Sequence, residues 1–362
     1  MESNTYPATG NGHDFLAIYG VGNVNFGKLV SFVPTTTPSQ MAHHINFAMG
    51  RHRLLFTNDF MAAESYVFDV DDPHKPAISA TFTNAGPYTH PHTFVQLSNG
   101  HILATYQVKD NVDTTGGLVE LDINGRMIRA SDASAPNVDP NIRPYSLQVI
   151  ESLDRVVTTT AVMPPLETKE AAHEVQVWRL HDLKLLKTID LPKPPTFKGI
   201  ANQDPDEAAL LADGKTLLVK TSRCGLFELT GVEGSDPEAQ FVYDFGGRSC
   251  SGVPVVVGNY WIEASMSNHD IVALDVHDPA HPVEASRLYL GPNAIPHWMS
   301  GDASTGDLVI TGFGSLLHRI SLAHVDTRTG ALTLDSRAID MLRQRWPDGW
   351  NGAAVPHGTM FY

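Results

Sequence analysis

Hydrophobic residues along this chain recur in short runs, and the spacing of an amphipathic helix is nearly absent. The runs are rich in Val, Ile, Leu, Phe and Tyr, and they are interrupted by Gly, Asn, Asp and Pro. Short apolar runs bounded by such turn residues are typical of β-strands. The tripeptide Ser98-Asn99-Gly100 separates two of the runs, and Asn-Gly at such a position favours a tight hairpin. The pattern therefore predicts an all-β protein.

The runs are grouped in units of four. Six complete units are expected, at residues 44–83, 92–130, 145–191, 208–245, 253–290 and 298–335. One internal repeat is explicit, because Phe68–Pro76 matches Leu274–Pro282 at Asp-Val, at Asp-Pro and at the final Pro. The two segments start roughly 200 residues apart, or four units of about 50 residues. Four-stranded units with this period indicate a β-propeller.

The two ends of the chain are expected to supply a seventh unit. Its innermost strand is predicted at Ala354–Phe361, with Phe15–Tyr19 and Lys28–Phe32 as the next two strands. Strands from both termini would close the ring and leave no open sheet edge. The expected fold is thus a seven-bladed β-propeller closed by strands from both termini, with residues 1–362 as a single domain. Two β-sandwiches are the alternative, although no linker separates two halves of the chain.

Composition and charge narrow the classes of partner. The chain has 362 residues and a formal net charge of -15, so we expect neither a nucleic acid nor an anionic membrane as a partner. No segment reaches the roughly 18 apolar residues of a membrane-spanning helix. Met1–Tyr6 has no basic start and no apolar run, so we expect no signal peptide and predict a cytoplasmic location. Cys224 and Cys250 are too few for a disulfide framework.

Histidines are the candidate metal ligands. The innermost strand of each propeller unit lines a central channel, so residues at the entrances of these strands face one another. The residues at these positions are His44, His92, Tyr145, Glu207, Ser251, His297 and His357. An all-imidazole set suits a first-row transition metal, and we predict that His44, His92, His297 and His357 form a metal site. His43 and His90 are near alternatives, because a shift in strand register would exchange them with their neighbours. The competing interpretation is that these are hydrogen-bonded channel residues, since the chain has 17 histidines.

The remaining channel positions include candidate catalytic residues. Glu207 is a candidate general base, or a group that orients a ligand histidine. Tyr145 is a candidate proton donor, and Arg143 is a candidate for holding a substrate anion. A structural role is the alternative for each of the three; Glu207, for example, lies beside Asp204 and Asp206 and is equally consistent with a solvated loop.

Two further sets of residues have open interpretations. Cys250, at the entrance of the fifth unit, is a candidate metal ligand or nucleophile, although a buried inert thiol is the commoner case. Cys224 follows a strand and is interpreted as a core residue. Trp346 and Trp350 surround Pro347-Asp348-Gly349, and they either cover one mouth of the channel or pack the last loop.

Several segments together resemble the selenium-binding protein family, which includes methanethiol oxidases. They are His43-His44, His90-Pro91-His92, Gly116–Asp122, Val175–Trp178 and Ala354–His357. The resemblance extends over most of the chain, and the histidine segments are its specific part. It implies a seven-bladed propeller in which channel histidines hold copper. His43, His44, His92 and His357 match that ligand pattern.

The chain also departs from this family. It is shorter than typical members, lacks their N-terminal cysteine segment and has no Cys-x-x-Cys, so the resemblance does not extend to selenium binding or thiol oxidation. His297 stands where a residue other than histidine is expected in the family. A set of four histidines resembles instead that of the carotenoid-cleavage dioxygenases, longer chains that hold iron in a seven-bladed propeller.

These observations predict a metal-dependent enzyme that acts on a small organic molecule in the channel. Oxidation is the favoured reaction, because the family includes oxidases and an all-histidine site suits copper or iron. A lyase or isomerase, with zinc or manganese as a Lewis acid on the same site, is the first alternative. A propeller that binds partners without catalysis is the second, because a fold alone does not determine function.

Overall fold

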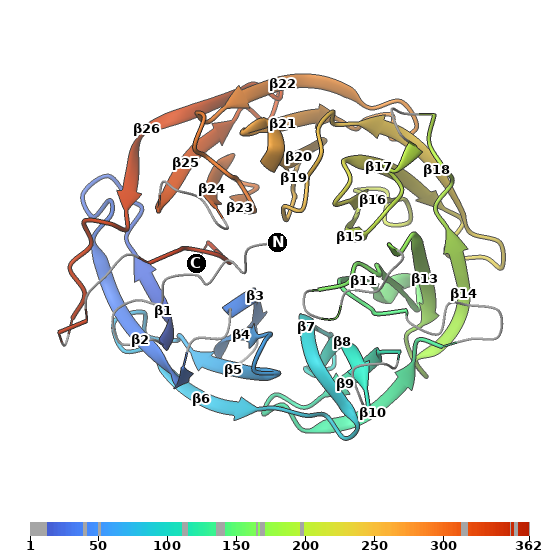
Figure 1. The fold of residues 1–362 in the computed structure, drawn as a ribbon, viewed down its shortest axis with the longest axis horizontal. Coiled ribbons are helices and arrows are strands. Elements are labelled where there is room, and N and C mark those ends of the chain that lie inside the picture. Colours follow the sequence, from blue (N-terminus) through green and yellow to red (C-terminus); the bar gives the residue numbers. More distant parts are fainter. Residues whose placement is uncertain are drawn as a thin grey trace.

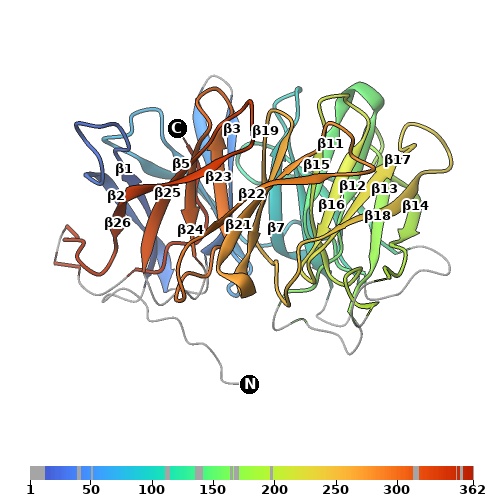
Figure 2. The same cartoon turned by 90° about the horizontal axis from the view of Figure 1, so that it is seen from above.

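The protein is a ring of β-sheets. The computed structural model describes residues 13–38, 42–49, 52–110, 115–134, 142–163, 166, 171–195, 199–312, 318–347, 349–350 and 354–361. In these residues six four-stranded sheets and one two-stranded sheet surround a common centre (Figure 1). Seen from the side, the sheets stand next to one another and their strands run between the two faces of a disc (Figure 2). The prediction of an all-β propeller is confirmed, and the alternative of two β-sandwiches is wrong.

Each four-stranded sheet is a blade whose strands pair antiparallel in chain order. Named from the centre of the ring outward, the first three blades are β3 (Ala42–Met49), β4 (Arg53–Asp59), β5 (Glu64–Asp69) and β6 (Ala77–Phe82); β7 (Tyr88–Gln96), β8 (Ile102–Lys109), β9 (Gly117–Leu121) and β10 (Met127–Asp132); and β11 (Leu147–Ile150), β12 (Arg155–Thr158), β13 (Glu174–Arg179) and β14 (Lys184–Asp190). The next three are β15 (Pro205–Leu210), β16 (Leu217–Thr221), β17 (Gly225–Thr230) and β18 (Glu238–Asp244); β19 (Val255–Val257), β20 (Tyr260–Ser265), β21 (Asp270–Asp275) and β22 (Val283–Tyr289); and β23 (Trp298–Asp302), β24 (Asp307–Thr311), β25 (Arg319–Val325) and β26 (Leu332–Asp340).

Burial along the strands explains why the sequence folds in this way. The second strands, such as β16 and β20, are buried at every position, because neighbouring blades cover both faces of each sheet. The outermost strand β6 alternates between exposed and half-buried residues. The predicted hairpin between β7 and β8 is confirmed: Gly100 has a φ of 86° and donates its N–H to the Leu97 carbonyl over 2.9 Å, a backbone conformation that favours glycine.

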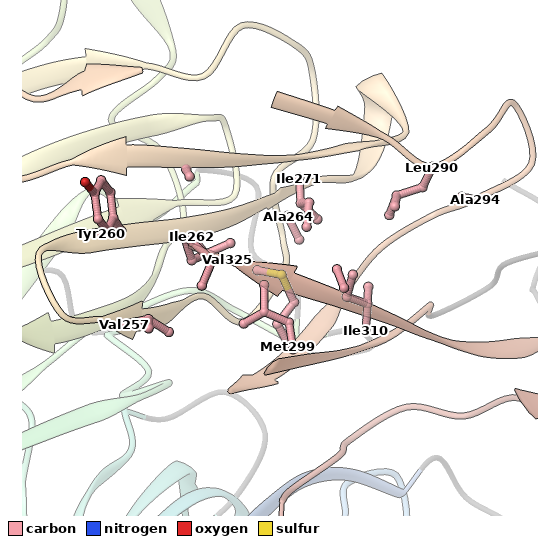
Figure 3. Close-up of a cluster of buried hydrophobic side chains, with 13 residues drawn as sticks. Val257, Tyr260, Ile262, Ala264, Ile271, Leu290, Ala294, Met299, Ile310 and Val325 are labelled. Atoms are coloured by element: carbon pink, nitrogen blue, oxygen red, sulfur yellow. The ribbon is translucent and has the colours of Figure 1, made fainter. Parts of the chain in front are cut away.

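The hydrophobic core is divided among the interfaces between blades. Figure 3 shows one such interface, where Ile262 and Ile271 of one blade pack against Met299 and Ile310 of the next. Comparable clusters join each blade to the next from the first to the fifth. Each blade therefore buries its two faces against two different sheets, which fixes the positions of the inner strands around the centre.

The predicted seventh blade is wrong. At its position the described residues form only a two-stranded sheet, β1 (His13–Tyr19) with β2 (Leu29–Pro38), and residues 354–361 form no strand. The ring thus has six four-stranded blades and a two-stranded sheet. Pro356 has no N–H to donate to a strand ladder. Gly358 passes so close to β3 that a Cβ atom on it would lie 2.9 Å from the His43 carbonyl oxygen.

The two-stranded sheet nevertheless packs between the first and last blades. One of its faces contacts Tyr66 and Phe68 of the first blade, and the other contacts Ile339 at the end of the last blade. Trp346 and Trp350 pack against aromatic rings of this sheet, with the Trp346 ring centroid 4.8 Å from that of Phe15. Of the two interpretations of these tryptophans, packing of the last loop is the one that the structure supports.

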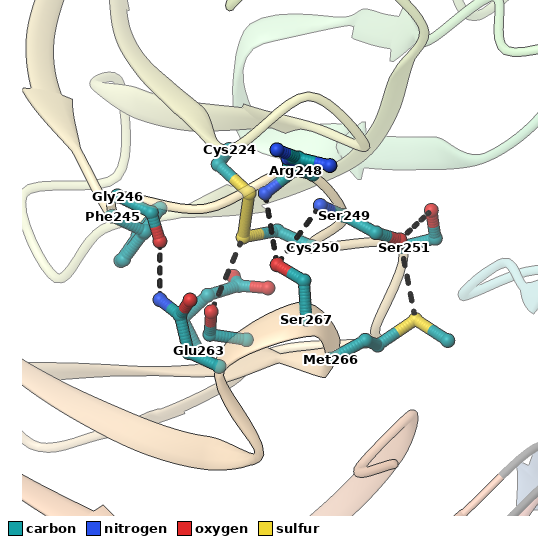
Figure 4. The surroundings of a disulfide bond; sticks show 12 residues. Cys224, Phe245, Gly246, Arg248, Ser249, Cys250, Ser251, Glu263, Met266 and Ser267 are labelled. Atoms are coloured by element: carbon teal, nitrogen blue, oxygen red, sulfur yellow. Dashed lines mark hydrogen bonds between the residues drawn. A yellow bond between two sulfur atoms is a disulfide. The ribbon is translucent and has the colours of Figure 1, made fainter.

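Cys224 and Cys250 form a disulfide bond (Figure 4). The interpretation of Cys250 as a metal ligand, nucleophile or inert thiol is therefore wrong, because the bonded sulfur is not a thiolate. Cys224 lies in the β16–β17 turn, and the Cys250 N–H donates to the Ser222 carbonyl of the same turn over 2.9 Å. Backbone pairing between consecutive blades, which spacing alone does not reveal, brings the two sulfurs together. Disulfides are typical of oxidising compartments, and the cytoplasmic location stays a prediction.

In the part of the chain that the structure describes, no helix has the length and apolar character needed to cross a bilayer.

Candidate metal centre

Five histidine side chains from four segments meet near the centre of the ring. His43 and His44 belong to β3, His92 belongs to β7, His297 immediately precedes β23, and His357 lies in the C-terminal segment. The first four are buried, with exposed fractions of 4%, 2%, 0% and 5%, and His357 is half-buried. The structure thus brings together the four predicted ligands and adds His43, which the sequence offered as an alternative.

An irregularity in β3 places two consecutive histidines in the cluster. Neighbouring residues of a regular strand point to opposite faces of the sheet. The pairing of β3 with β4 changes register between Ala42 and Ile45. Irregularities of this kind redirect side chains, and here the rings of His43 and His44 lie with their centroids 4.8 Å apart.

A similar irregularity and a buried amide position His92. The pairing of β7 with β8 changes register between Pro91 and Phe94, around His92. The Asn58 side chain, which is fully buried, joins the two histidine-bearing strands. Its Oδ1 accepts the backbone N–H of His44 over 2.6 Å, and its Nδ2 donates to the Pro91 carbonyl over 2.8 Å. Asn58 therefore fixes β3 and β7 at the point where their histidines meet.

The five histidines form two overlapping triads. In each triad every ring offers one nitrogen, and these three nitrogens lie within 4.8 Å of one another. The first triad contains His43, His44 and His92, and the second contains His43, His297 and His357. Ring centroids are 4.0 Å apart between His44 and His92, and 4.7 Å apart between His297 and His357. Such a cluster can hold a metal ion, because imidazole nitrogens are common ligands of Zn, Cu, Fe and Ni.

Hydrogen bonds to backbone carbonyls fix the tautomers of two of the rings. Nδ1 of His92 lies 2.9 Å from the Tyr145 carbonyl oxygen, and Nδ1 of His357 lies 2.9 Å from the Ala42 carbonyl oxygen. A carbonyl oxygen only accepts hydrogen bonds, so each Nδ1 carries the ring proton. The Nε2 atoms of His92 and His357 consequently keep their lone pairs, which is the arrangement found in metal-bound histidines.

Three Nε2 atoms of the cluster are buried without a hydrogen-bond partner among the described residues. They belong to His43, His44 and His92. On the other side of the His44 ring, Nδ1 forms a hydrogen bond with the Thr93 hydroxyl over 3.0 Å. Buried polar atoms normally have partners, so three unpartnered nitrogens in one place are a feature that a bound cation would explain.

The surroundings keep these imidazoles neutral. Burial, together with the neighbouring histidines, lowers the pKa of His43, His44 and His92 well below the ordinary value. Burial also lowers the pKa of His297 well below that value, and lowers the pKa of His357 to about 4. Neutral imidazole is the form that binds metal ions.

Tyr145 lies beside the first triad, and both Tyr145 and Arg143 belong to the segment before β11. The Tyr145 ring packs on His92 with centroids 3.8 Å apart, and burial raises the pKa of its hydroxyl well above the usual range. The Arg143 guanidinium is almost completely buried and donates through Nη1 to the Gln107 carbonyl over 2.8 Å. Tyr145 thus packs against the cluster, and the predicted catalytic roles of both residues stay predictions.

Glu207, in β15, faces the first triad from across the ring. Its Oε1 lies 3.7 Å from Nε2 of His44, and its Oε2 accepts a hydrogen bond from the Ser146 hydroxyl over 2.7 Å. Burial raises the pKa of this carboxyl to about 8. Glu207 is therefore a buried acid that carries a proton near neutral pH, and its interpretation as a solvated loop residue is wrong.

Next to Glu207 is a buried network of charged residues around Lys220. The Lys220 Nζ lies 2.8 Å from Oδ2 of Asp206 and 3.6 Å from Oε1 of Glu263, and it also donates to the Cys250 carbonyl. Burial raises the pKa of Asp206 to about 7 and that of Glu263 to about 8, against the opposing effect of Lys220. Burial alone would lower the pKa of Lys220, but the two carboxyl groups raise it.

Sequence reasoning missed Lys220, Glu263 and Ser146. A signal was present for the first two, because each is a single charged residue inside an otherwise uncharged buried strand, Leu217–Thr221 and Tyr260–Ser265. Ser146 has no comparable signal. His90, the other alternative ligand, belongs to neither triad among the described residues.

No protein-family model matches this chain. No curated protein sequence matches it either.

Solved structures share the fold. The structure of a hypothetical selenium-binding protein from Sulfolobus tokodaii is similar to this chain, with a TM-score of 0.77 and 12% identity over 91% of this chain and 87% of the other. The β-propeller domain of Cps50 (Swd1) from Myceliophteria thermophila has a TM-score of 0.58 and 12% identity, over 84% and 89% of the two chains. A protein from Lactobacillus plantarum has a TM-score of 0.57 and 14% identity, over 83% of each chain.

At these identities the likeness establishes the propeller fold alone. It agrees with the resemblance to selenium-binding proteins at the level of the fold, over most of the chain. The chemistry of the site must therefore be argued from its own residues.

Proposed function

We propose that the protein is a metal-dependent enzyme that acts on a small organic molecule in the channel, and that the reaction is an oxidation. The observation that carries the proposal is the set of three buried Nε2 atoms, those of His43, His44 and His92, that have no hydrogen-bond partner among the described residues. Each belongs to a ring held in the neutral form by its surroundings. With a formal net charge of -15, a small molecule is a better substrate class than a nucleic acid or an anionic membrane.

Copper or iron is the favoured cofactor. The donor set consists of imidazole nitrogens, without the thiolate of an electron-transfer copper site and without the oxygen-rich set that magnesium and calcium prefer. A bound copper or iron ion would supply one-electron chemistry at an open coordination position. Zinc and manganese are also compatible with imidazole ligands, and they belong to the redox-neutral alternative.

Glu207 is the candidate group for proton transfer. Because the Ser146 hydroxyl donates to Oε2, the carboxyl proton is held on Oε1, which is the atom that lies toward His44. A pKa of about 8 keeps that proton in place at neutral pH but allows its release in a modestly basic environment. Tyr145 keeps its proton, since its pKa is raised well above 10, and orients His92 through its backbone carbonyl.

A lyase or isomerase reaction is the second candidate. The specific observation in its favour is the raised pKa of Glu207, because a buried acid with a pKa near neutrality suits general acid–base catalysis without electron transfer. The identity of the metal separates the two candidates.

The test is elemental analysis of the purified protein together with His92→Ala and His297→Ala variants. His281→Ala serves as the matched control, because that histidine is exposed and pairs with Asp278 in a surface turn. Stoichiometric copper or iron in the wild type and the control, reduced in both site variants, is the expected result. Stoichiometric zinc or manganese would instead favour the redox-neutral reaction.

The proposal fails if the wild-type protein carries no metal and takes up none when copper, iron, zinc or manganese salts are added. That outcome would leave a non-catalytic binding scaffold as the remaining function. Circular dichroism and thermal unfolding of each variant separate the loss of a ligand from the loss of the fold.

A further inference from the structure

The two triads share a single residue, His43. Of the four histidines predicted from the sequence, His44 and His92 belong to one triad, whereas His297 and His357 belong to the other. The ring of His43 lies between the two pairs, with its centroid 4.9 Å from that of His92 and 4.3 Å from that of His357. The candidate ligand atoms of the five channel histidines thus fall into two groups instead of one.

The two nitrogens of His43 have different environments. Its Nδ1 lies 3.3 Å from Nδ1 and 3.0 Å from Nε2 of His357. Since the Nδ1 proton of His357 is donated to the Ala42 carbonyl, the contact with Nε2 is a hydrogen bond in which Nδ1 of His43 is the donor. The Nε2 atom of His43 therefore keeps its lone pair, and it has no hydrogen-bond partner among the described residues.

The spacing of these atoms suits metal coordination. Two nitrogens bound at about 2.0–2.1 Å to one tetrahedral ion lie about 3.3–3.4 Å apart. The 3.0 Å between Nδ1 of His43 and Nε2 of His357 is slightly below this value, so an ion between them requires only a small separation of the rings. Five histidines also exceed the three protein ligands of a typical catalytic site.

We propose that the channel binds two transition-metal ions, one in each triad, with the imidazole of His43 between them. One ion is held by His43, His44 and His92, and the other by His43, His297 and His357. This inference rests on the proposed function in that it assumes a metal site in the channel, and it specifies that site as dinuclear. Three protein nitrogens per ion leave an open position on each ion for substrate.

Binding of both ions by His43 requires the loss of its single ring proton. Neutral His43 carries one ring proton, on Nδ1, and binds the first ion through the lone pair of Nε2. Binding of the second ion at Nδ1 breaks that N–H bond and forms a metal–nitrogen bond, and the proton goes to solvent. The shared ring is then an imidazolate, and the hydrogen bond to His357 is replaced by a common ion. No oxidant or reductant takes part in this step.

The experiment counts copper in protein that has first been stripped with EDTA and then loaded with Cu(II), with excess removed by gel filtration. We expect two copper ions per chain in the wild type and in the exposed control His281→Ala. His92→Ala and His297→Ala, which alter different triads, should each retain one ion. His43→Ala should lose the tight binding of both.

Electron paramagnetic resonance gives a second, independent readout. Two Cu(II) ions joined through one imidazolate couple magnetically, so the integrated signal of the wild type should be smaller than its copper content. In His92→Ala and His297→Ala the lone ion should give a signal equal to the copper content. Conservative variants, His92→Asn and His297→Gln, repeat the comparison if the alanine variants do not fold.

One copper per wild-type chain, lost in both His92→Ala and His297→Ala, would overturn the dinuclear site but leave the proposed metal-dependent function intact. Two coppers with a full, uncoupled signal would overturn the shared position of His43. No uptake by the wild type would overturn the inference and the proposed function together. The wild-type count alone decides between one ion and two, whatever the behaviour of the variants.

Discussion

The protonation of single residues governs the chemistry of this site. The channel histidines are held neutral by burial and by one another, whereas Glu207 and Glu263 are held protonated by burial. The centre of a protein with a formal net charge of -15 is therefore close to neutral around its imidazoles. Neutral nitrogens on one side and a proton-bearing carboxyl on the other are what a metal site with its own proton source requires.

The stability of the metal-free protein should fall as the pH drops below about 6.5. The channel histidines have folded-state pKa values below the unfolded value, so the unfolded chain binds more protons and acid favours unfolding. The contribution of these histidines to stability is fully present above pH 6.5. It is lost as the pH falls toward the folded-state pKa, which is about 4 for His357. That ring alone accounts for about 2 kcal/mol of the free energy of unfolding, after allowance for its partial exposure.

Urea unfolding of EDTA-treated protein at pH 7.5 and pH 5 measures this effect, and His92→Ala should show a smaller pH difference than the wild type. An equal pH difference in the two proteins would contradict the assignment of the effect to the cluster. The exposed control His281→Ala should match the wild type.

At the residue scale, the sequence located most of the cluster because inner-strand entrances face one another in any propeller. Alternation along a regular strand assigns His43 and His44 to opposite faces, so a regular β3 would bring only one of the two rings into the cluster. The register change between Ala42 and Ile45 overrides that alternation. No local pattern in the sequence reveals such an irregularity.

Individual strands carry charged residues into the interior and join blades through them. Lys220 in β16 contacts Asp206 in β15 of its own blade and Glu263 in β20 of the next. The Trp261 indole N–H donates to Glu263 over 3.1 Å. Two consecutive blades are thus tied by a buried network, which reaches the disulfide between the same blades through the Cys250 carbonyl. Figure 4 shows Glu263 of this network near the disulfide.

Lys220→Met should destabilise the protein by about 3–5 kcal/mol at pH 8, the cost of removing one partner of a buried ion pair. The cost should be smaller at pH 5. Asp206 and Glu263 have folded-state pKa values raised to about 7 and about 8, so both carboxyl groups are protonated and neutral at pH 5. As the pH rises through these values they ionise, and in Lys220→Met the buried carboxylates without their lysine destabilise the fold.

Urea unfolding at the two pH values measures the difference. Lys187→Met is the control, because Lys187 is exposed and lies 4.0 Å from Asp236 at the surface. Its free energy of unfolding should stay within about 0.5 kcal/mol of the wild type. The same cost for Lys220→Met at both pH values would argue against the titration of its acidic partners.

At the element scale, apolar runs and turn residues were enough to predict the strands of six blades. They were not enough for residues 354–361, where apolar residues are interspersed with Pro356 and Gly358. Composition suggested a strand there, but a proline and the close approach of the chain to β3 leave no ladder in this segment. The segment contributes His357 instead of an inner strand.

The whole molecule depends on how the C-terminal segment is held against the first blade. The Thr311 hydroxyl of the last blade donates to the His357 carbonyl, and Met360 packs on the hydrophobic cluster of the first blade. A Cβ atom on Gly358 would lie 2.5 Å from Cγ2 of Ile45. The segment therefore fits only with glycine at this position.

Gly358→Val should displace the segment, lower the free energy of unfolding by about 1–3 kcal/mol, and reduce the metal content. Gly22→Val is the matched control, because a Cβ at Gly22 meets nothing within 4 Å. Thermal unfolding and metal analysis of the two variants provide the measurement. Full metal content in Gly358→Val would show that the position of His357 does not depend on this contact.

The separation of the histidines along the chain determines the order in which the ribosome makes them. His43, His44 and His92 are all made early, whereas His357 follows His43 by 314 residues. At about 5–20 residues per second, ribosomal synthesis leaves an interval of about 15–60 s between the two. The nascent chain can assemble one triad during that interval, but the other has to wait for the last strand and the segment beyond it. With the proposed dinuclear site, capture of metal would thus be ordered by translation, and the second ion would mark a finished ring.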